Sequence, residues 1–417
     1  MLYHSSNIKA TNPNIIRYTD LLIIIFIGLA AFSSQWSIAA SSIGIGGLIL
    51  LTAFRLVLKR DDLKIDKNVL ILFAAYLLIQ VISSAICGDP ADSFDNMYRK
   101  ASIYIVFFAS IFFIRQPLQL KRMLTALFLF TAFISVVELV RFAIDYLPNP
   151  QMPIGEYRLQ YFGFPLTNGA IKMMVLLITV PLLFTKESFV FGRTSLAKLW
   201  LALISLPILA TFYLTNARNA VLGLFTGLLV YGIMKNRYFL AGLIAVTLGF
   251  LLLAPLPMKE RILSIADLDH SSNHTRIVMW ETGLKIFKDN PVTGVGDVDI
   301  NKVYRQYKTP EFHGEGSHMH SNFVQILVNY GAAGITAWLA LMLYIFYRQL
   351  SIFRETNKQN FPNTLAVISI SSMAALMVSG LTEWNFGDAE FAAIMWFNLA
   401  LAFIASTFIK GGEDALH

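Results

Sequence analysis

One short stretch of the chain combines a candidate proton acceptor with the start of a membrane helix. Residues 317–336 (S-H-M-H-S-N-F-V-Q-I-L-V-N-Y-G-A-A-G-I-T) change from polar to apolar within a few positions. This pattern predicts a helix that begins near Ser321 or Asn322 and leaves His320 where water meets lipid. The unpaired N–H groups and the dipole of such a helix start favour a nearby phosphate and disfavour a charged imidazolium. A neutral His320 beside an anion is therefore a candidate general base.

The expected helix also carries a polar seam. Ser321, Gln325 and Asn329 recur every four residues, so they share one helix face. Polar side chains at membrane depth usually face a cavity or another helix. The seam is thus compatible with a binding cavity or with helix packing, which Gly331 and Gly334 would assist.

Three arginines are candidates for one shared anion site. Arg158, Arg218 and Arg276 each stand in a segment that joins or covers predicted membrane helices. Arginine stays protonated and grips phosphate in a bidentate fork, so a pair can stabilise a diphosphate without a metal. The alternatives are snorkelling for Arg218 and a surface role for Arg276.

A metal site has to be weighed because several possible ligands are close in sequence. His313, Glu315, His318 and His320 fall within eight residues. Their spacing matches no recognised zinc pattern, and loop histidines are often only solvated. We therefore expect no metal, and the single Cys87 excludes both a cysteine-based metal cluster and an intrachain disulfide.

The composition identifies the kind of molecule that must position these residues. Hydrophobic residues make up 56 % of the 417 residues and charged residues only 14 %, which excludes an ordinary soluble domain. The formal charge of +7 resembles that of nucleic-acid-binding proteins. Most Lys and Arg residues, however, lie in short segments between apolar runs, so we expect a bilayer and no nucleic acid as partner.

The apolar runs predict an all-α polytopic membrane protein. About twelve runs can span a core of roughly 30 Å. They lie at about 20–34, 37–54, 68–87, 101–114, 122–143, 168–185, 198–213, 219–234, 238–255, 321–347, 364–383 and 389–409. The runs at 101–114 and 198–213 are the shortest.

Loop charges predict the orientation of these spans. Lys and Arg concentrate in alternate segments, so the positive-inside rule places both termini in the cytoplasm and the long segment from about 254 to 320 outside it. Six ionisable residues then fall at the outer ends of spans, which indicates that the working face is the outer one. They are Glu138, Arg141, Lys172, Arg218, Glu383 and Asp388. For Glu138 and Arg141 we favour a structural ion pair.

The long outer segment carries its own pattern. Ile277, Trp280, Leu284 and Phe287 are spaced as one apolar stripe of an amphipathic helix that lies on the membrane or covers the spans. A Gly-rich turn, G-V-G-D-V-D, follows at 294–299 and lacks the strand and helix of a nucleotide-binding fingerprint.

Several of these segments together resemble the bacterial O-antigen ligase and O-antigen polymerase superfamily. The runs T-R-I-V-M-W-E-T-G-L-K-I-F-K-D-N-P-V-T-G-V-G and H-S-N-F-V-Q-I-L-V-N-Y-G-A-A-G-I resemble its signature. The pattern R-x-x-x-x-G-x-x-x-x-N-x-A from Arg158 to Ala170, and N-A-R-N-A-V-L-G around Arg218, look like its upstream motifs. Two departures are the missing third Gly and aromatic residue in the Gly-rich turn, and the additional His318.

The resemblance implies a GT-C-type glycosyltransferase in the bacterial inner membrane whose active site faces the periplasm. Its donor would be a glycan on undecaprenyl diphosphate and, in the ligase branch, its acceptor the lipid A-core oligosaccharide. Transfer would invert the anomeric carbon without nucleotide, metal or other cofactor. His320 would match the catalytic histidine, and Arg218 and Arg276 the diphosphate-binding arginines.

The same resemblance completes the expected site and its domains. Arg158 and Asn168 match an upstream motif, and we add His318 and Asn322 as candidate substrate-binding residues. We expect nine spans in residues 1–255, a periplasmic loop with its amphipathic helix in 256–320, and three spans in 321–417.

Two other functions remain compatible with the sequence. A polymerase of the same superfamily would join repeat units on the lipid carrier. A multi-pass transporter or flippase would also have about twelve spans and a polar cavity. The outer loop, with its amphipathic helix, histidine and arginines, argues against a transporter, and we take the ligase as the first choice and the polymerase as the second.

Overall fold

The computed structural model describes residues 12–58, 65–148, 150, 152–154, 156–185, 194–253, 264, 267, 271–308, 318–357 and 360–413. Within these ranges the regular structure is helical, with no strand. The predicted all-α class is therefore confirmed. His313 and Glu315 lie outside the described residues, as do Lys9, Lys59, Arg60, Lys64, Lys186, Arg193 and Lys358, which contributed to the predicted orientation.

Nine helical segments among the described residues are long and apolar enough to cross a membrane. They are α1 (Pro13–Phe32, continued by the 3-10 helix η1, Ser33–Gln35), α2 (Ile38–Leu58), α3 (Lys67–Ile86), α6 (Pro117–Asp145), α7 (Pro165–Leu183), α8 (Thr194–Leu214), α14 (Asn322–Glu355), α15 (Phe361–Ser379) and α16 (Ala389–Glu413). The chain is thus a polytopic membrane protein.

The predicted number of about twelve spans is not confirmed, because three of the predicted runs fall short. Helix α5 (Tyr104–Phe113) has 10 residues, which reach only about 15 Å, and it follows the polar helix α4 (Pro90–Ser102). Helix α10 (Arg237–Leu253) has 17 residues. Helix α9 (Arg218–Lys235) has 18, but Arg218, Asn219 and Lys235 at its two ends make it less apolar.

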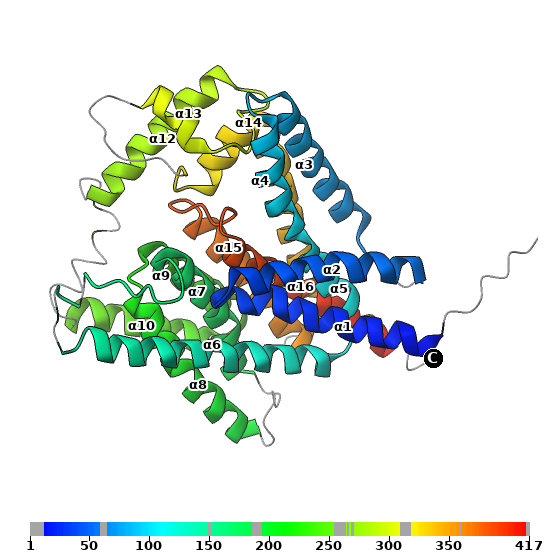
Figure 1. Ribbon diagram of the computed structural model, residues 1–417. Coiled ribbons are helices and arrows are strands. Elements are labelled where there is room, and N and C mark those ends of the chain that lie inside the picture. Colours follow the sequence, from blue (N-terminus) through cyan, green and yellow to red (C-terminus); the bar gives the residue numbers. More distant parts are fainter. Residues whose placement is uncertain are drawn as a thin grey trace, which may run out of the picture.

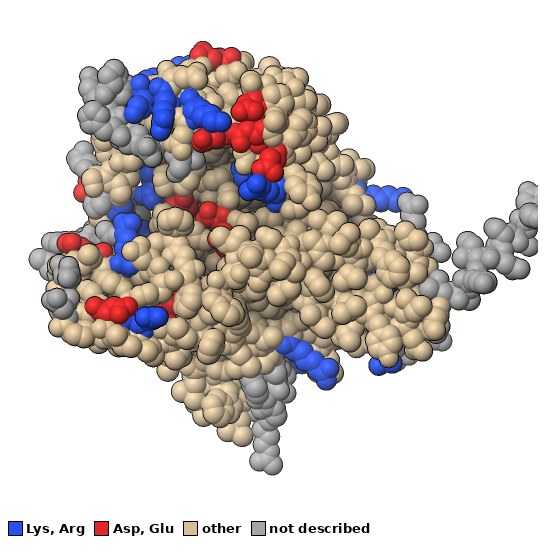
Figure 2. All heavy atoms as spheres, viewed as in Figure 1, with Lys and Arg blue, Asp and Glu red and all other residues tan. Residues whose placement is uncertain are grey.

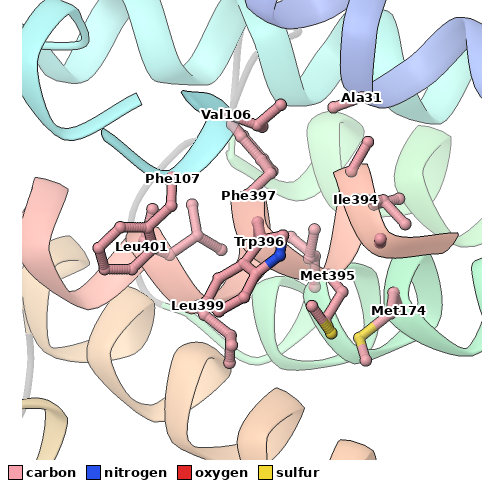
Figure 3. Packing of buried hydrophobic residues seen from close by; sticks show 14 of the residues in the cluster. Ala31, Val106, Phe107, Met174, Ile394, Met395, Trp396, Phe397, Leu399 and Leu401 are labelled. Atoms are coloured by element: carbon pink, nitrogen blue, oxygen red, sulfur yellow. The ribbon is translucent and has the colours of Figure 1, made fainter. Parts of the chain in front are cut away.

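The helices differ strongly in how much of their surface is buried. Within the span of each helix, 72 % of α7 and 78 % of both α15 and α16 is buried, against 28 % of α8 and 33 % of α2 and α3. The ring of Trp396 on α16 packs against the rings of Phe73 from α3 and of Tyr104 and Phe107 from α5. Figure 3 shows Trp396 and Phe107 within this packing. The central helices are therefore held by close aromatic packing, while the outer ones leave apolar surface for lipid.

Helix α14 starts and bends where the sequence suggested. The side chain of Ser321 caps it by accepting a hydrogen bond from the Val324 N–H, as predicted for a start at Ser321 or Asn322. The helix breaks at Gly331, whose φ of 63° places it in the left-handed region. A Cβ there would lie 2.3 Å from the Val292 carbonyl oxygen, so only glycine allows this approach.

The Gly-rich turn docks against this bend. The N–H groups of Val295 and Gly296 donate to the carbonyls of Val328 and Asn329 at 3.0 and 2.9 Å. In return, the N–H groups that follow the bend, such as that of Ala332, donate to carbonyls just before the turn. The turn therefore pairs backbone groups that the bend removes from the helix ladder, which gives it a structural role.

The amphipathic helix of the outer segment is present, and the face that it buries against the protein differs from its apolar stripe. It is α12 (Ser271–Asp289), and its buried residues are Met279, Thr282, Gly283 and Ile286, whereas Leu284 of the predicted stripe is 46 % exposed. The helix packs on α14 and on α13 (Ile300–Tyr307). Gly283 allows the approach, because a Cβ there would lie 2.7 Å from a methyl carbon of Val324.

Figure 1 shows α12, α13 and the start of α14 on one side, and α6, α8, α9 and α10 on the other, with α15 and α16 between them.

The predicted pair between Glu138 and Arg141 is wrong. Glu138 on α6 instead accepts from Lys172 on α7 at 2.6 Å, and both side chains are almost completely buried. Because Glu138 is buried between α6 and α7, its charge partner is Lys172 on α7, whereas Arg141 on α6 is exposed.

Candidate active site

His320 pairs with an acidic side chain from a distant part of the chain. Its Nδ1 lies 3.2 and 3.3 Å from the two carboxylate oxygens of Glu383, in the segment that joins α15 to α16. A carboxylate only accepts hydrogen bonds, so Nδ1 must carry a proton, and in the neutral imidazole the lone pair is then on Nε2. This is the tautomer that a general base requires.

The backbone conformation of His320 and the hydrogen bonds of the residues that follow it fix its position. Its φ of 43° lies in the left-handed region, an unusual conformation for a residue other than glycine that surrounding structure must enforce. Directly after it, the Asn322 N–H donates to the Gly380 carbonyl at 2.8 Å, and the Asn385 N–H donates to Oδ1 of Asn322 at 2.7 Å. Asn322, a predicted substrate-binding residue, thus ties the start of α14 to the segment that carries Glu383.

Glu383 is only 5 % exposed and serves as the centre of the cluster. Besides His320, its carboxylate oxygens lie 3.8 Å from Nε2 of His318 and 3.9 Å from Nη2 of Arg276. Burial alone would raise the pKa of this carboxyl, but the hydrogen bond from His320 and the positive charges around it lower the pKa below its ordinary value. Glu383 is therefore a buried anion.

His318 is a neutral imidazole next to His320. The two ring centroids are 4.0 Å apart, and Nδ1 of His318 accepts a hydrogen bond from the backbone N–H of His320 at 3.2 Å. Burial lowers the pKa of His318 to about 4, and the neighbouring His320, Arg276 and Lys100 act in the same direction. His318 therefore supports the turn that presents His320.

Arg276 reaches the cluster from α12 and has an unused donor. Its side chain is 15 % exposed, and its buried Nε has no hydrogen-bond partner among the described residues. Burial lowers the pKa of Arg276, Glu383 opposes this effect, and the charge of Arg158 adds to it. The guanidinium of Arg276, with its unused donor, is therefore a suitable partner for an anionic ligand.

Arg218 is tied to the first turn of α12. Its guanidinium donates to the Ser264 carbonyl at 2.8 Å, to the Ser272 hydroxyl and to Oδ1 of Asn273 at 3.3 Å. Ser272 and Arg276 are four residues apart and so share one face of α12. Arg218 thus positions the helix that carries Arg276, an arrangement that snorkelling alone does not explain.

Asn168 is not part of the cluster around His320. Its amide donates to Glu138 at 2.6 Å and accepts from Lys172 at 2.5 Å, within the buried contact between α6 and α7. Its neighbour Thr167, however, donates to Oδ2 of Asp388 at 2.7 Å. Burial raises the pKa of Asp388 to about 6, and the negative charges of Glu383 and Glu390 add to the rise. Asp388 therefore borders the site.

The polar seam of α14 mainly packs and positions. Gln325 donates to Asn329 at 2.8 Å and Asn329 to Asp297 at 3.0 Å, while Oε1 of Gln325 accepts from the Met319 N–H at 2.7 Å. The seam thereby fixes the turn between His318 and His320. Asp297, in the Gly-rich turn, also accepts from Lys100 at 2.6 Å, a contact that the sequence did not suggest.

Three side chains of the cluster could contact one metal ion. One ligand atom each from His318, His320 and Glu383 lies within 4.8 Å of the other two. The nearby Arg276 opposes a cation at this place. The two acidic residues of the Gly-rich turn are already engaged, Asp297 with Lys100 and Asp299 as the N-cap of α13.

The surface around the cluster is hollowed between α12 and α9. Figure 2 shows Lys and Arg atoms at the edge of this hollow and Asp and Glu atoms inside it. The fold and site together define a polytopic membrane protein whose polar site combines a histidine, a buried carboxylate and an arginine. Such a site can take up a proton beside a bound anion.

Comparison with known families relates part of the chain to a described family. A family model described as O-antigen ligase matches residues 200–339, about a third of the chain. The match runs from α8 into α14 and includes Arg218, Arg276 and His320, whereas Glu383 lies beyond it. This part of the chain is therefore similar to the O-antigen ligase family, and the resemblance drawn from its motifs is confirmed. A search of curated proteins finds no match.

Proposed function

We propose that this protein is an inverting O-antigen ligase. It transfers a glycan from undecaprenyl diphosphate to a hydroxyl of the lipid A-core oligosaccharide. The observation that carries the proposal is the contact between His320 and Glu383 beside Arg276, because it joins a base to an anion-binding group. The family match supports the class, since ligases and polymerases of glycosyltransferase type share this domain.

In the proposed reaction, Nε2 of His320 removes the proton of the acceptor hydroxyl as its oxygen attacks the anomeric carbon. The bond from that carbon to the diphosphate oxygen breaks, and the diphosphate leaves with the electron pair. Glu383 stabilises the imidazolium that forms, an arrangement known from other catalytic histidines. General base catalysis of this kind typically contributes about 10²–10⁴ in rate.

The arginines act on the leaving group. Arg276 compensates the charge that develops on the diphosphate, we assign Arg158 to the same role, and Arg218 holds α12 in place. The bond between sugar and diphosphate supplies the driving force, so we assign no cofactor. We place the site at the periplasmic face of the inner membrane, with both termini in the cytoplasm and a GT-C-type organisation.

The test is transfer by purified protein in detergent or nanodiscs with lipid-linked glycan as donor and O-chain-free lipopolysaccharide as acceptor. We expect the wild type to transfer, and His320→Ala to lose about 10³-fold or more while keeping its melting temperature. His318→Gln is a useful comparison, because it alters the other histidine of the turn. Near-normal transfer by His320→Ala would contradict the proposal.

A polymerase is the second candidate, because the matching family includes both activities. The lipopolysaccharide bands of a deletion strain distinguish them. Loss of every O-chain with accumulation of lipid-linked polymer indicates a ligase, whereas a single repeat on the core indicates a polymerase.

A further inference from the structure

The backbone of Met319, directly before the proposed base His320, is held from two sides. Its N–H donates to Oε1 of Gln325 on α14 at 2.7 Å, and its carbonyl accepts from Nε1 of Trp280 on α12 at 2.9 Å. Met319 itself is completely buried. Because this backbone leads directly into the left-handed conformation of His320, the two contacts help to set where the imidazole lies.

The contact with Gln325 continues as a chain of buried hydrogen bonds that ends at Asp297 in the Gly-rich turn. Nε2 of Gln325 donates to Oδ1 of Asn329 at 2.8 Å, and Nδ2 of Asn329 donates to Oδ1 of Asp297 at 3.0 Å. The three residues are 3 %, 1 % and 2 % exposed, in the same order. Water therefore has little access to replace a lost partner, so removing one group leaves the next one without its hydrogen bond.

The carboxylate at the end of this chain fixes which way the two amides point. An amide can turn so that its oxygen and nitrogen exchange places, whereas a carboxylate only accepts hydrogen bonds. Asp297 thus requires the NH₂ group of Asn329, which directs the oxygen of Asn329 to the NH₂ group of Gln325. The oxygen of Gln325 then remains for the Met319 N–H. The negative charge of Asp297 therefore determines that an acceptor faces this N–H.

Asp297 is itself anchored by α4 and α14. Its Oδ1 accepts from Lys100 at 2.6 Å and its Oδ2 from the Tyr330 hydroxyl at 3.0 Å. Its backbone N–H donates to the Ser93 hydroxyl at 2.7 Å, and its carbonyl accepts from the Asn96 amide at 2.9 Å. The carboxylate is thus a fixed starting point for the chain of amides.

We propose that Asp297 is a positioning residue for glycosyl transfer, which acts through Asn329 and Gln325 to keep Met319, and with it the imidazole of His320, in the reactive place. The inference rests on the proposed function, in which His320 is the base. A misplacement of about 1 Å can cost about 10²-fold in rate. Loss of the chain should therefore lower kcat and leave substrate binding nearly unchanged.

The first test is Gln325→Met in the purified transfer assay, with donor and acceptor varied separately. Methionine keeps the length of the side chain and removes both the acceptor of the Met319 N–H and the donor to Asn329. We expect kcat to fall about tenfold while the KM for each substrate changes less than about twofold, because the base moves and the anion-binding arginine stays in place.

Gln349→Met is the matched control. Gln349 lies on the same helix, is 0 % exposed and donates to the Ser369 hydroxyl at 2.9 Å, far along α14 from the turn that holds His320. Its loss also removes a buried amide, so the melting temperature should fall about as much as for Gln325→Met. Its kcat should remain at the wild-type value.

Asp297→Asn tests the role of the charge and provides a second variant if Gln325→Met does not fold. It keeps the shape of the side chain but no longer dictates the orientation of the Asn329 amide. We expect kcat to fall about fivefold, again with KM for both substrates within about twofold of wild type.

Wild-type kcat for the variants of Gln325 and Asp297, or an equal fall of kcat for Gln349→Met, would overturn the positioning role. A loss confined to KM would overturn it as well, because it would indicate a defect in substrate binding. The proposed function would stand in each of these cases. Near-normal transfer by His320→Ala would instead contradict the proposed function, and the positioning role with it.

Discussion

Two groups of charged residues near the membrane illustrate opposite uses of burial. Between α6 and α7, Glu138 and Lys172 are in contact at 2.6 Å, are almost fully buried and share Asn168. Around Glu383, the contacts are longer, from 3.2 to 3.9 Å, and the partners His320, His318 and Arg276 remain partly accessible. The charges of Glu138 and Lys172 compensate each other and stabilise the structure. The second group retains the lone pair of neutral His320 and the unused donor of Arg276 for chemistry.

The largest effect on stability should come from breaking the saturated pair. Lys172→Met leaves Glu138 buried without its counter-ion, which typically costs about 3–5 kcal/mol. We expect little folded protein by size-exclusion chromatography and a strongly lowered melting temperature. The double variant Glu138→Gln/Lys172→Met should recover most of the loss. A single variant as stable as wild type would show that this pair is not structural.

Arg218→Lys should reduce activity by an intermediate amount. A lysine cannot reproduce the fork that contacts Ser272 and Asn273, so α12 and Arg276 lose part of their support. We expect transfer to fall about tenfold, measured as kcat/KM for the donor. Arg141→Lys, on the exposed face of α6, is the control and should remain close to wild type. Equal activity of both variants would favour snorkelling for Arg218.

The smallest effect concerns Asp388 and depends on pH. Folding raises the pKa of the Asp388 carboxyl to about 6. The protonated carboxyl therefore favours the folded state, and its contribution to the free energy of unfolding is lost as the pH rises through that value. Asp388→Asn should therefore stabilise the protein by about 1–2 kcal/mol at pH 7.5, allowing for the partial exposure of the residue, and by nothing near pH 4. Melting temperatures at both pH values test this. A gain that is equal at both would exclude titration of Asp388 as its cause.

Local patterns predicted what depends on nearby residues. The change from polar to apolar sequence indicated the start of α14, and the spacing of its polar residues indicated the seam. The helix of the outer segment was also predictable. The face that it buries against α13 and α14, which includes Met279 and Ile286, could not be derived from the sequence, because it depends on elements that are distant along the chain or have no strong pattern.

Long-range pairing could not be derived from the sequence. Glu383 was noted as an ionisable residue at an outer end of a span, but its contact with His320 joins positions 63 residues apart. Glu138 was assigned to Arg141, three residues away, because helical spacing reveals only partners on the same helix, whereas its actual partner comes from α7.

The account depends most on His320 and Glu383 acting as one unit. A double-mutant cycle with His320→Ala, Glu383→Gln and the combined variant, measured as transfer rate in the purified assay, tests this directly. If Glu383 acts only through the imidazole, the combined variant should be no slower than His320→Ala, because residues that act as a unit are strongly non-additive. If the losses of the two single variants multiply instead, the residues act independently and the proposed base is wrong.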